Sequence, residues 1–136
     1  MNIKFLYIEY GNKKTYKEEL TYSLATLLDH HSLVKSEVLV YTENPEFYAH
    51  LPVTAVSIAQ DIPAYSLNGI YHFRVKPCVI KRALQEHGQN ANIVFLDTDT
   101  YFKNNINRHL AKINAQHVLM NKFEKRNPYP GEVLNL

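Results

Sequence analysis

The chain has 136 residues, of which 46% are hydrophobic and 12% aromatic. These values are typical of a folded domain and exclude a disordered tail, and the length predicts one domain with a single core over residues 1–136. Fifteen Lys and Arg against thirteen Asp and Glu give a formal net charge of +2. That excess is too small to indicate nucleic acid as a partner.

The cysteine count and the lack of long apolar segments bear on the compartment. Cys78 is the only cysteine, which excludes an internal disulfide and favours a reducing compartment. The first apolar stretch is too short for a signal peptide, and no segment reaches membrane-spanning length. We therefore expect a soluble, cytoplasmic protein, and peripheral attachment to a membrane stays open. The seven histidines show no metal-ligand spacing, and surface positions are expected for them.

Strand-like and helix-like segments alternate along the chain. Short runs rich in β-branched and aromatic residues predict strands at residues 3–10, 37–41, 54–58, 93–96 and 118–120. Helices are predicted from a capping box at Thr15–Glu18 through Leu28, at 44–52, at 77–87 with Val79, Ile80, Ala83 and Leu84 on one face, and at 106–113. Residues 60–73 show no periodicity and predict a long connection of the kind that is often functional.

The alternation predicts the fold class. It favours an open, mostly parallel, doubly wound α/β sheet. In such sheets ligands bind outside the carboxyl ends of the strands. The candidate loops are therefore those after Tyr10, after Tyr41 and after Leu96.

The strongest chemical signal is IVFLDTDTYF at residues 93–102. Asp97 and Asp99 follow a buried strand directly, where two carboxylates are costly unless their charge is compensated. Mg²⁺ or Mn²⁺ would compensate it, since these ions prefer carboxylate oxygen and often bind phosphate oxygens as well. Both side chains approach one ion only if the backbone turns near Thr98; otherwise one carboxylate binds sugar hydroxyls. Capping of a turn is the alternative role.

With this motif the chain resembles the GT-A glycosyltransferases, especially the glycogenin and bacterial galactosyltransferase group. In that family a DxD motif ends a buried strand and leads to a helix, as FLDTDTYF leads here to Ile106–Ile113. The resemblance follows the order of elements over most of the chain, and the DxD motif is its specific part. It implies a GT-A sheet that is incomplete on the C-terminal side, and Mn²⁺ or Mg²⁺ bound by Asp97 and Asp99. It also implies hexosyl transfer from a UDP-sugar to a glycan, lipid or protein acceptor.

A second similar segment is HFRVKPCVIKRAL at residues 72–84. A residue before proline is disfavoured in a helix, so Lys76 is expected at the mouth of a helix that Pro77 opens. A helix N-terminus beside a basic residue forms an anion site. The resemblance implies that Lys76, and secondarily Arg74, lies near the nucleotide-sugar; solvated surface charges are the alternative.

A third similarity concerns the nucleotide base. In the glycogenin group an early helical tyrosine stacks on the base, and Tyr16 is similar in spacing. The Thr-Asn-Asp that precedes that tyrosine in the family is absent, and residues 12–14 are Asn-Lys-Lys. An ordinary exposed tyrosine is the alternative for Tyr16, and Tyr10 offers another stacking surface.

Two other functions stay open. A DxDx[TV] phosphatase is disfavoured because Tyr101 occupies the Thr or Val position and because the motif follows three other strands. A non-catalytic nucleotide-sugar-binding remnant is the stronger alternative, since 37 residues follow Asp99 and they contain no recognisable acceptor motif. The catalytic base, nucleophile and third metal ligand are not identified, so the chain alone is expected to bind a donor but to transfer little sugar. An open sheet edge would favour a homo-oligomer.

Overall fold

The computed structural model describes residues 2–114 and 117–118. One compact unit, Met1–Asn105, contains the sheet, and a second unit begins at Ile106. The elements of the first unit are β1 (Ile3–Glu9), α1 (Lys14–His30), η1 (Lys35–Glu37), β2 (Val38–Thr42), η2 (Pro45–Tyr48), β3 (Thr54–Ser57), α2 (Ile62–Tyr65), η3 (His72–Arg74), α3 (Val75–His87) and β4 (Asn92–Leu96).

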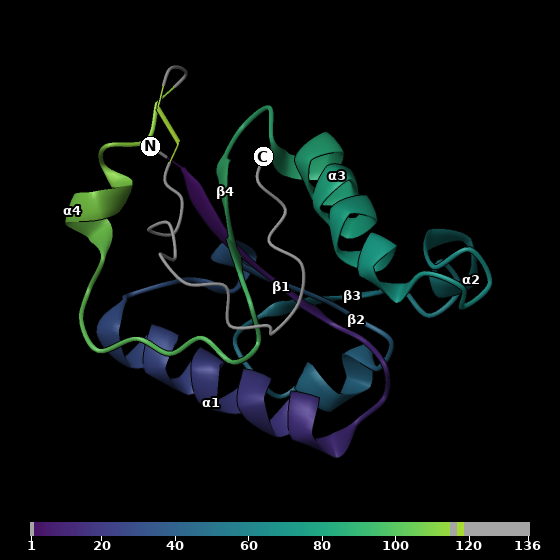
Figure 1. The fold of residues 1–136 in the computed structure, drawn as a ribbon. Helices are drawn as coiled ribbons and strands as arrows, with labels where there is room; N and C mark the ends of the chain where they lie inside the picture. Colours follow the sequence, from purple (N-terminus) through teal and green to yellow (C-terminus); the bar gives the residue numbers. More distant parts are fainter. Residues whose placement is uncertain (1, 115–116, 119–136) are drawn as a thin grey trace, which may run out of the picture. The chain divides into compact units, whose positions relative to one another are not determined.

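The four strands form one parallel sheet in the order β3-β2-β1-β4 (Figure 1). β1 is central, and its residue Leu6 lies opposite Leu39 of β2 and Phe95 of β4. The chain moves outward from β1 through β2 to β3 and then returns to the other side of β1. Such a reversal is the switch point at which open α/β sheets bind ligands. The predicted α/β class and parallel sheet are confirmed.

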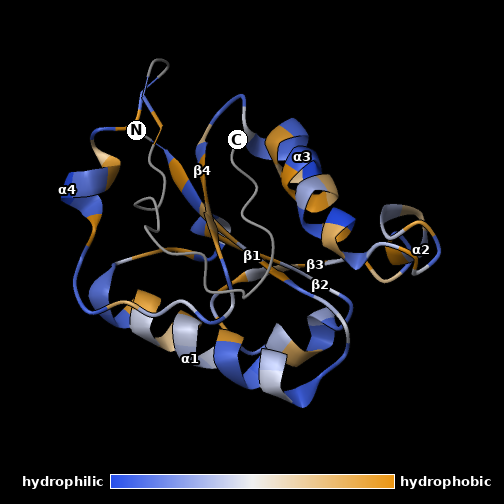
Figure 2. Cartoon of the chain, in the orientation of Figure 1, coloured by the Kyte–Doolittle hydropathy of each residue, from blue (hydrophilic) through white to orange (hydrophobic). Residues whose placement is uncertain are grey.

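Helices cover both faces of this sheet, with α1 on one side and α3 on the other (Figure 1). Side chains of a strand point alternately to opposite faces. Tyr7 therefore meets α1, where its hydroxyl is 2.8 Å from the Ser23 hydroxyl. Leu6 and Ile8 face α3 and form a core with its residues Val75, Val79 and Ala83. Figure 2 shows the strands between these helices as predominantly hydrophobic.

The start of α1 differs from the prediction. The helix begins at Lys14, its N-cap residue is Lys13, and no side chain caps it. The capping box predicted at Thr15–Glu18 is therefore wrong, because Thr15 already lies inside the first turn. The helix is stabilised instead by its buried stripe of Leu20, Ser23, Leu24 and Leu27, and such packing outweighs local capping preferences.

The start of α3 also differs from the prediction. The helix begins at Val75, so Lys76 lies in its first turn and not at the mouth of a helix opened by Pro77. Pro77 is tolerated there because the first amides of a helix have no intrahelical partner. Leu84, predicted on the buried face, is 49% exposed. The buried stripe runs through Val79 and Ala83, and the next residue along a helix is rotated by about 100°.

Three smaller predictions have different outcomes. The connection at 60–73 contains two short helical turns, α2 and η3. His31, expected at the surface, is 3% exposed, and its ring contacts Phe5 and Phe102 at centroid distances of 5.7 Å and 5.4 Å. None of the described helices combines the length and apolarity needed to span a bilayer.

The second unit contains α4 (Asn107–Leu110), a single turn within the predicted helix 106–113. Asn114 and His117 form an isolated antiparallel bridge. Of the strand predicted at 118–120, Val118 is not in a strand. The rest of that strand and the tail 121–136 lie outside the described residues.

Candidate functional site

A cavity of about 520 Å³ opens at the carboxyl edge of the sheet. It lies at the switch point, where the ends of β1 and β4 meet the first turns of α1 and α3. Its lining comprises Ile8, Glu9, Tyr10 and Gly11 from the end of β1 and its loop, Lys13 and Tyr16 from the start of α1, His72, Phe73 and Lys76 from η3 and α3, and Thr98 after β4.

The DxD motif forms a turn at this edge. β4 ends at Leu96, opposite Tyr7 of β1, and Asp97 follows at once. The Thr100 amide donates a hydrogen bond to the Asp97 carbonyl oxygen at 3.0 Å, which closes a turn around Thr98 and Asp99. The backbone thus turns where a shared ion would require it. Both aspartates are exposed, and the residue of this turn that lines the cavity is Thr98.

Lys76 links α3 to this turn. Its ammonium group donates a hydrogen bond to the Asp97 carboxylate and lies 5.9 Å from the centroid of the Phe95 ring. The Lys76 and Asp97 side chains are 42% and 51% exposed, and an ion pair of this kind contributes at most about 1 kcal/mol to stability. The sequence predicts that a metal ion compensates the negative charge of Asp97. In the structure Lys76 compensates it.

Tyr10 lies in the cavity wall, where its hydroxyl donates a hydrogen bond to the His72 carbonyl oxygen at 3.1 Å. Burial raises the pKa of this hydroxyl above its usual 10.0, although the nearby Lys76 charge opposes the increase. Tyr10 is therefore protonated at neutral pH. It ties the end of β1 to the segment that leads into α3.

Tyr16 lies on the α1 side of the cavity. A Cβ atom at Gly11 would come within 3.3 Å of the Tyr16 ring, so the ring packs on the glycine backbone, whose φ is +96°. The Lys13 ammonium lies 5.3 Å from the centroid of the ring. Half-buried Tyr16 and Tyr10 thus offer two aromatic surfaces to a ligand.

Arg74 is placed differently and does not line the cavity. Its guanidinium group donates to the carbonyl oxygens of Ala64 and Tyr65 at 2.9 Å and 3.3 Å. These contacts fasten η3 to α2. The geometry gives Arg74 a structural role, and the nucleotide contact predicted for it stays a prediction.

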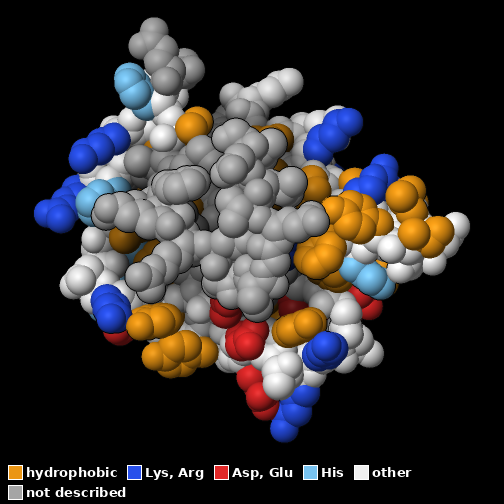
Figure 3. All heavy atoms as spheres, viewed as in Figure 1, with side chains coloured by type: hydrophobic (Ala, Val, Ile, Leu, Met, Phe, Trp, Pro, Cys, Tyr) orange, Lys and Arg blue, Asp and Glu red, His pale blue; other side chains and the backbone are white. Residues whose placement is uncertain are grey.

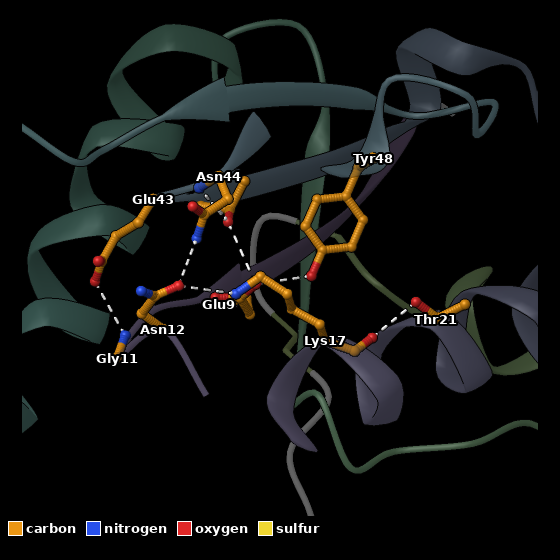
Figure 4. A network of polar contacts seen from close by, with 9 residues as sticks. Glu9, Gly11, Asn12, Lys17, Thr21, Glu43, Asn44 and Tyr48 are labelled. Atoms are coloured by element: carbon orange, nitrogen blue, oxygen red, sulfur yellow. Dashed lines mark hydrogen bonds and ion pairs between the residues drawn. The ribbon is translucent and has the colours of Figure 1, made fainter. Parts of the chain in front are cut away.

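Two residues after β2 hold the loop after β1, and the sequence analysis did not single them out. Glu43 accepts a hydrogen bond from the Gly11 amide at 3.0 Å, and the Asn44 side-chain amide donates to Asn12 at 3.3 Å (Figure 4). Asn12 has a φ of 51°, a conformation that asparagine tolerates better than most residues. The sequence did contain a signal for these residues: Glu43 and Asn44 are polar and directly follow a strand, at an edge already expected to bind ligands.

Glu9 was also missed, and it lies buried beneath this loop with 1% exposure. Its Oε1 accepts a hydrogen bond from the Tyr48 hydroxyl at 2.8 Å and lies 3.6 Å from the Lys17 ammonium (Figure 4). Its Oε2 has no hydrogen-bond partner among the described residues. Burial, followed by the bond to Glu9, raises the pKa of Tyr48, which keeps this phenol a donor. The sequence signal for a buried Glu9 was its position inside the apolar run IKFLYIEY.

The sequence matches no known protein family, and no curated protein or solved structure is significantly similar to the chain. What the cavity binds is therefore inferred from its own residues.

The charges and helix ends around the cavity suit an anion. The first turns of α1 and α3 both contribute to it, and neither helix has a side-chain cap or an acidic residue in its first turn. Helix N-termini attract anions because their amides and dipoles present partial positive charge. Lys13 and Lys76 add two ammonium groups to the lining, and that of Lys76 is paired with Asp97.

The oxygen atoms at the edge suit a hard divalent cation, provided that a ligand supplies some of the coordination. Asp97 and Asp99 offer two exposed carboxylates in this turn, of which the Asp97 carboxylate binds Lys76. Among residues 2–114 and 117–118, no group of three or more His, Cys, Asp or Glu could hold a metal. Mg²⁺ is commonly bound by one or two carboxylates together with substrate phosphates and water. The residues therefore fit a metal–diphosphate complex better than a metal alone.

Proposed function

We propose that the chain binds a UDP-sugar in this cavity and is a metal-dependent glycosyltransferase of the GT-A type. One observation carries the proposal: two aromatic rings, two lysines and Thr98 of the DxD turn line a single cavity at the switch point of a parallel sheet. An aromatic surface suits a nucleotide base, and the cationic groups suit a diphosphate. This combination is the chemistry of a nucleotide-diphosphate ligand.

Each part of the cavity has a role in this proposal. Tyr16 or Tyr10 stacks on the base. Lys76 and the N-terminus of α3 bind the diphosphate, and Asp97 and Asp99 hold a divalent cation against it. A divalent cation in that position would stabilise the negative charge that develops on the leaving diphosphate. The hexosyl group then passes to a glycan, lipid or protein acceptor.

A nucleotide-sugar-binding module without catalytic activity is the second candidate. It is favoured by the small number of metal-ligating side chains at the edge within the described residues. Incubation with radiolabelled UDP-sugars, Mn²⁺ and candidate acceptors separates the two. Turnover at about 1 per second or faster would support the enzyme, and binding without transfer would support the module.

Titration with UDP-sugars tests the ligand itself. Ligand-observed NMR of the whole chain with UDP-glucose or UDP-galactose is expected to show saturable binding in Mn²⁺ and weaker binding in chelator. UMP is a matched control, because it keeps the base and ribose but lacks the second phosphate. Equal binding of UMP and UDP-sugar, or equal binding with and without metal, would argue against the proposal.

Replacing Lys76 with alanine is expected to weaken UDP binding. The loss of one charge-assisted contact is worth roughly 1.5–3 kcal/mol, or about tenfold to a hundredfold in affinity. The melting temperature should change little, since the ion pair to Asp97 is largely exposed.

Lys81→Ala provides the control for this variant, because Lys81 is an exposed lysine of the same helix outside the cavity. Calorimetry should give the Lys81 variant an affinity close to that of the unmodified chain. If the Lys76 variant behaved like the Lys81 variant, Lys76 would be an ordinary surface charge.

A further inference from the structure

The connection between β3 and α3 exposes an unusual amount of apolar surface. All residues from 67 to 74 are exposed. Four of them are large and apolar and are named the apolar loop here: Leu67, Ile70, Tyr71 and Phe73, which are 48%, 84%, 54% and 79% exposed. Figure 3 shows hydrophobic side chains gathered over the region of α2 and the start of α3. Contiguous exposed apolar surface of this kind marks an interaction site.

The backbone of the apolar loop is held in place. The Tyr71 amide donates to the Ser66 carbonyl oxygen at 2.9 Å, and the Asn68 amide donates to the Pro63 carbonyl oxygen at 2.7 Å. Leu67 has a φ of 53°, which is uncommon and costly for such a residue. The fold therefore keeps a strained conformation that presents leucine and isoleucine to solvent.

Every charged side chain in the stretch 62–85, which contains the apolar loop, is cationic. No acidic residue occurs between Asp61 and Glu86, whereas Arg74, Lys76, Lys81 and Arg82 lie in this stretch. Arg82 is paired with both flanking acids, but Lys81 is exposed on α3. Exposed aliphatic and aromatic side chains beside cationic ones are typical of surfaces that bind anionic lipid bilayers.

We propose that the apolar loop docks the protein on the surface of a membrane that contains anionic lipids. Leu67, Ile70 and Tyr71 enter the interface between headgroups and acyl chains, and Lys81 approaches the lipid phosphates. His72 and Phe73 also line the cavity, so docking would bring the mouth of the cavity to the membrane surface. The proposal does not depend on which ligand the cavity binds.

Co-sedimentation of the whole chain with vesicles tests this proposal. The chain is expected to bind phosphatidylcholine vesicles that contain phosphatidylglycerol, and to bind pure phosphatidylcholine vesicles less tightly. The variant Leu67→Asn/Ile70→Ser should lower binding at least about tenfold. Its backbone should be unharmed, because asparagine adopts positive φ readily. Lys81→Gln should lower binding to the anionic vesicles by roughly fivefold. It should leave binding to pure phosphatidylcholine vesicles unchanged.

The matched control is Tyr22→Ser/Val34→Ser, which removes two side chains that are 63% and 62% exposed elsewhere on the sheet unit. Its vesicle binding should equal that of the unmodified chain. The proposal is overturned if the chain binds neither vesicle, or if the control variant loses as much binding as the loop variant. A concentration-dependent dimer that the loop variant abolishes, without vesicle binding, would overturn it in favour of contact between two copies.

Discussion

Replacing Asp99 with asparagine is expected to remove most of the Mn²⁺ dependence of UDP-sugar binding. Asparagine keeps the shape of the side chain but loses the charge that a divalent ion requires. Replacing a residue that only hydrogen-bonds to a metal ligand already lowers metal affinity roughly tenfold to a hundredfold. Replacing a residue proposed to bind the metal directly should lower it at least as much. Isothermal titration with UDP-glucose, in Mn²⁺ and in chelator, measures the effect. Asp29→Asn, at an exposed acid of α1, is the control and should change neither value.

Asp97→Asn should show an effect of opposite sign in the two conditions. With Mn²⁺ it should weaken binding, since the proposed ligand of the ion is lost. In chelator it strengthens UDP binding slightly, because Lys76 loses its partner Asp97 and its ammonium becomes available to phosphate. A uniform loss in both conditions would indicate that Asp97 acts only through the shape of the turn.

Replacing Lys17 with methionine is expected to be the most destabilising of these substitutions. Glu9 is fully buried as a side chain, and Lys17, which is 13% exposed, lies 3.6 Å from it. Removal of one partner of a buried pair leaves an uncompensated charge and costs about 3–5 kcal/mol. Urea denaturation monitored by circular dichroism gives the free energy of unfolding.

Two variants make this result interpretable. Lys14→Met removes a lysine that pairs with Glu18, and the two side chains are 88% and 60% exposed. This variant should lower the free energy of unfolding by less than about 0.5 kcal/mol. Glu9→Gln/Lys17→Met should be more stable than Lys17→Met alone, because no charge stays buried. If the double variant were the less stable of the two, charge compensation would not be the function of Lys17.

The extent of each strand was predictable from the sequence, but some features that depend on packing were not. Apolar runs such as IKFLYIEY and IVFL locate β1 and β4 within a few residues, because strands buried on both faces need continuous apolar sequence. Helix starts were less predictable. α1 and α3 both begin before their local signals, at Lys14 and Val75, since the stripe packed on the sheet decides how far each helix extends.

The candidate site was predictable where its residues are consecutive in the sequence. The turn at Asp97–Thr100 follows directly from the end of β4. Lys76, Tyr10 and Tyr16 line one cavity, and the ligand contacts predicted for them stay predictions. The contacts of Glu43 and Lys17 could not be deduced in the same way. Their partners Gly11 and Glu9 are contacted across elements, and a single sequence contains no record of such pairs.

The pairing of β4 with β1 has a consequence for the order in which the sheet assembles. Phe5 pairs with both Val38 and Val94, so the second contact closes a loop of about 90 residues, and closure of the longer loop costs more chain entropy. β1, β2 and β3 are joined by shorter connections and are expected to form first, with β4 added last. By the same reasoning β4 should open most easily in the native state, so its amides should exchange hydrogen faster than those of β1. Such opening would move Thr98 and its neighbours Asp97 and Asp99 away from the cavity while Tyr10, Gly11 and Tyr16 stay in place.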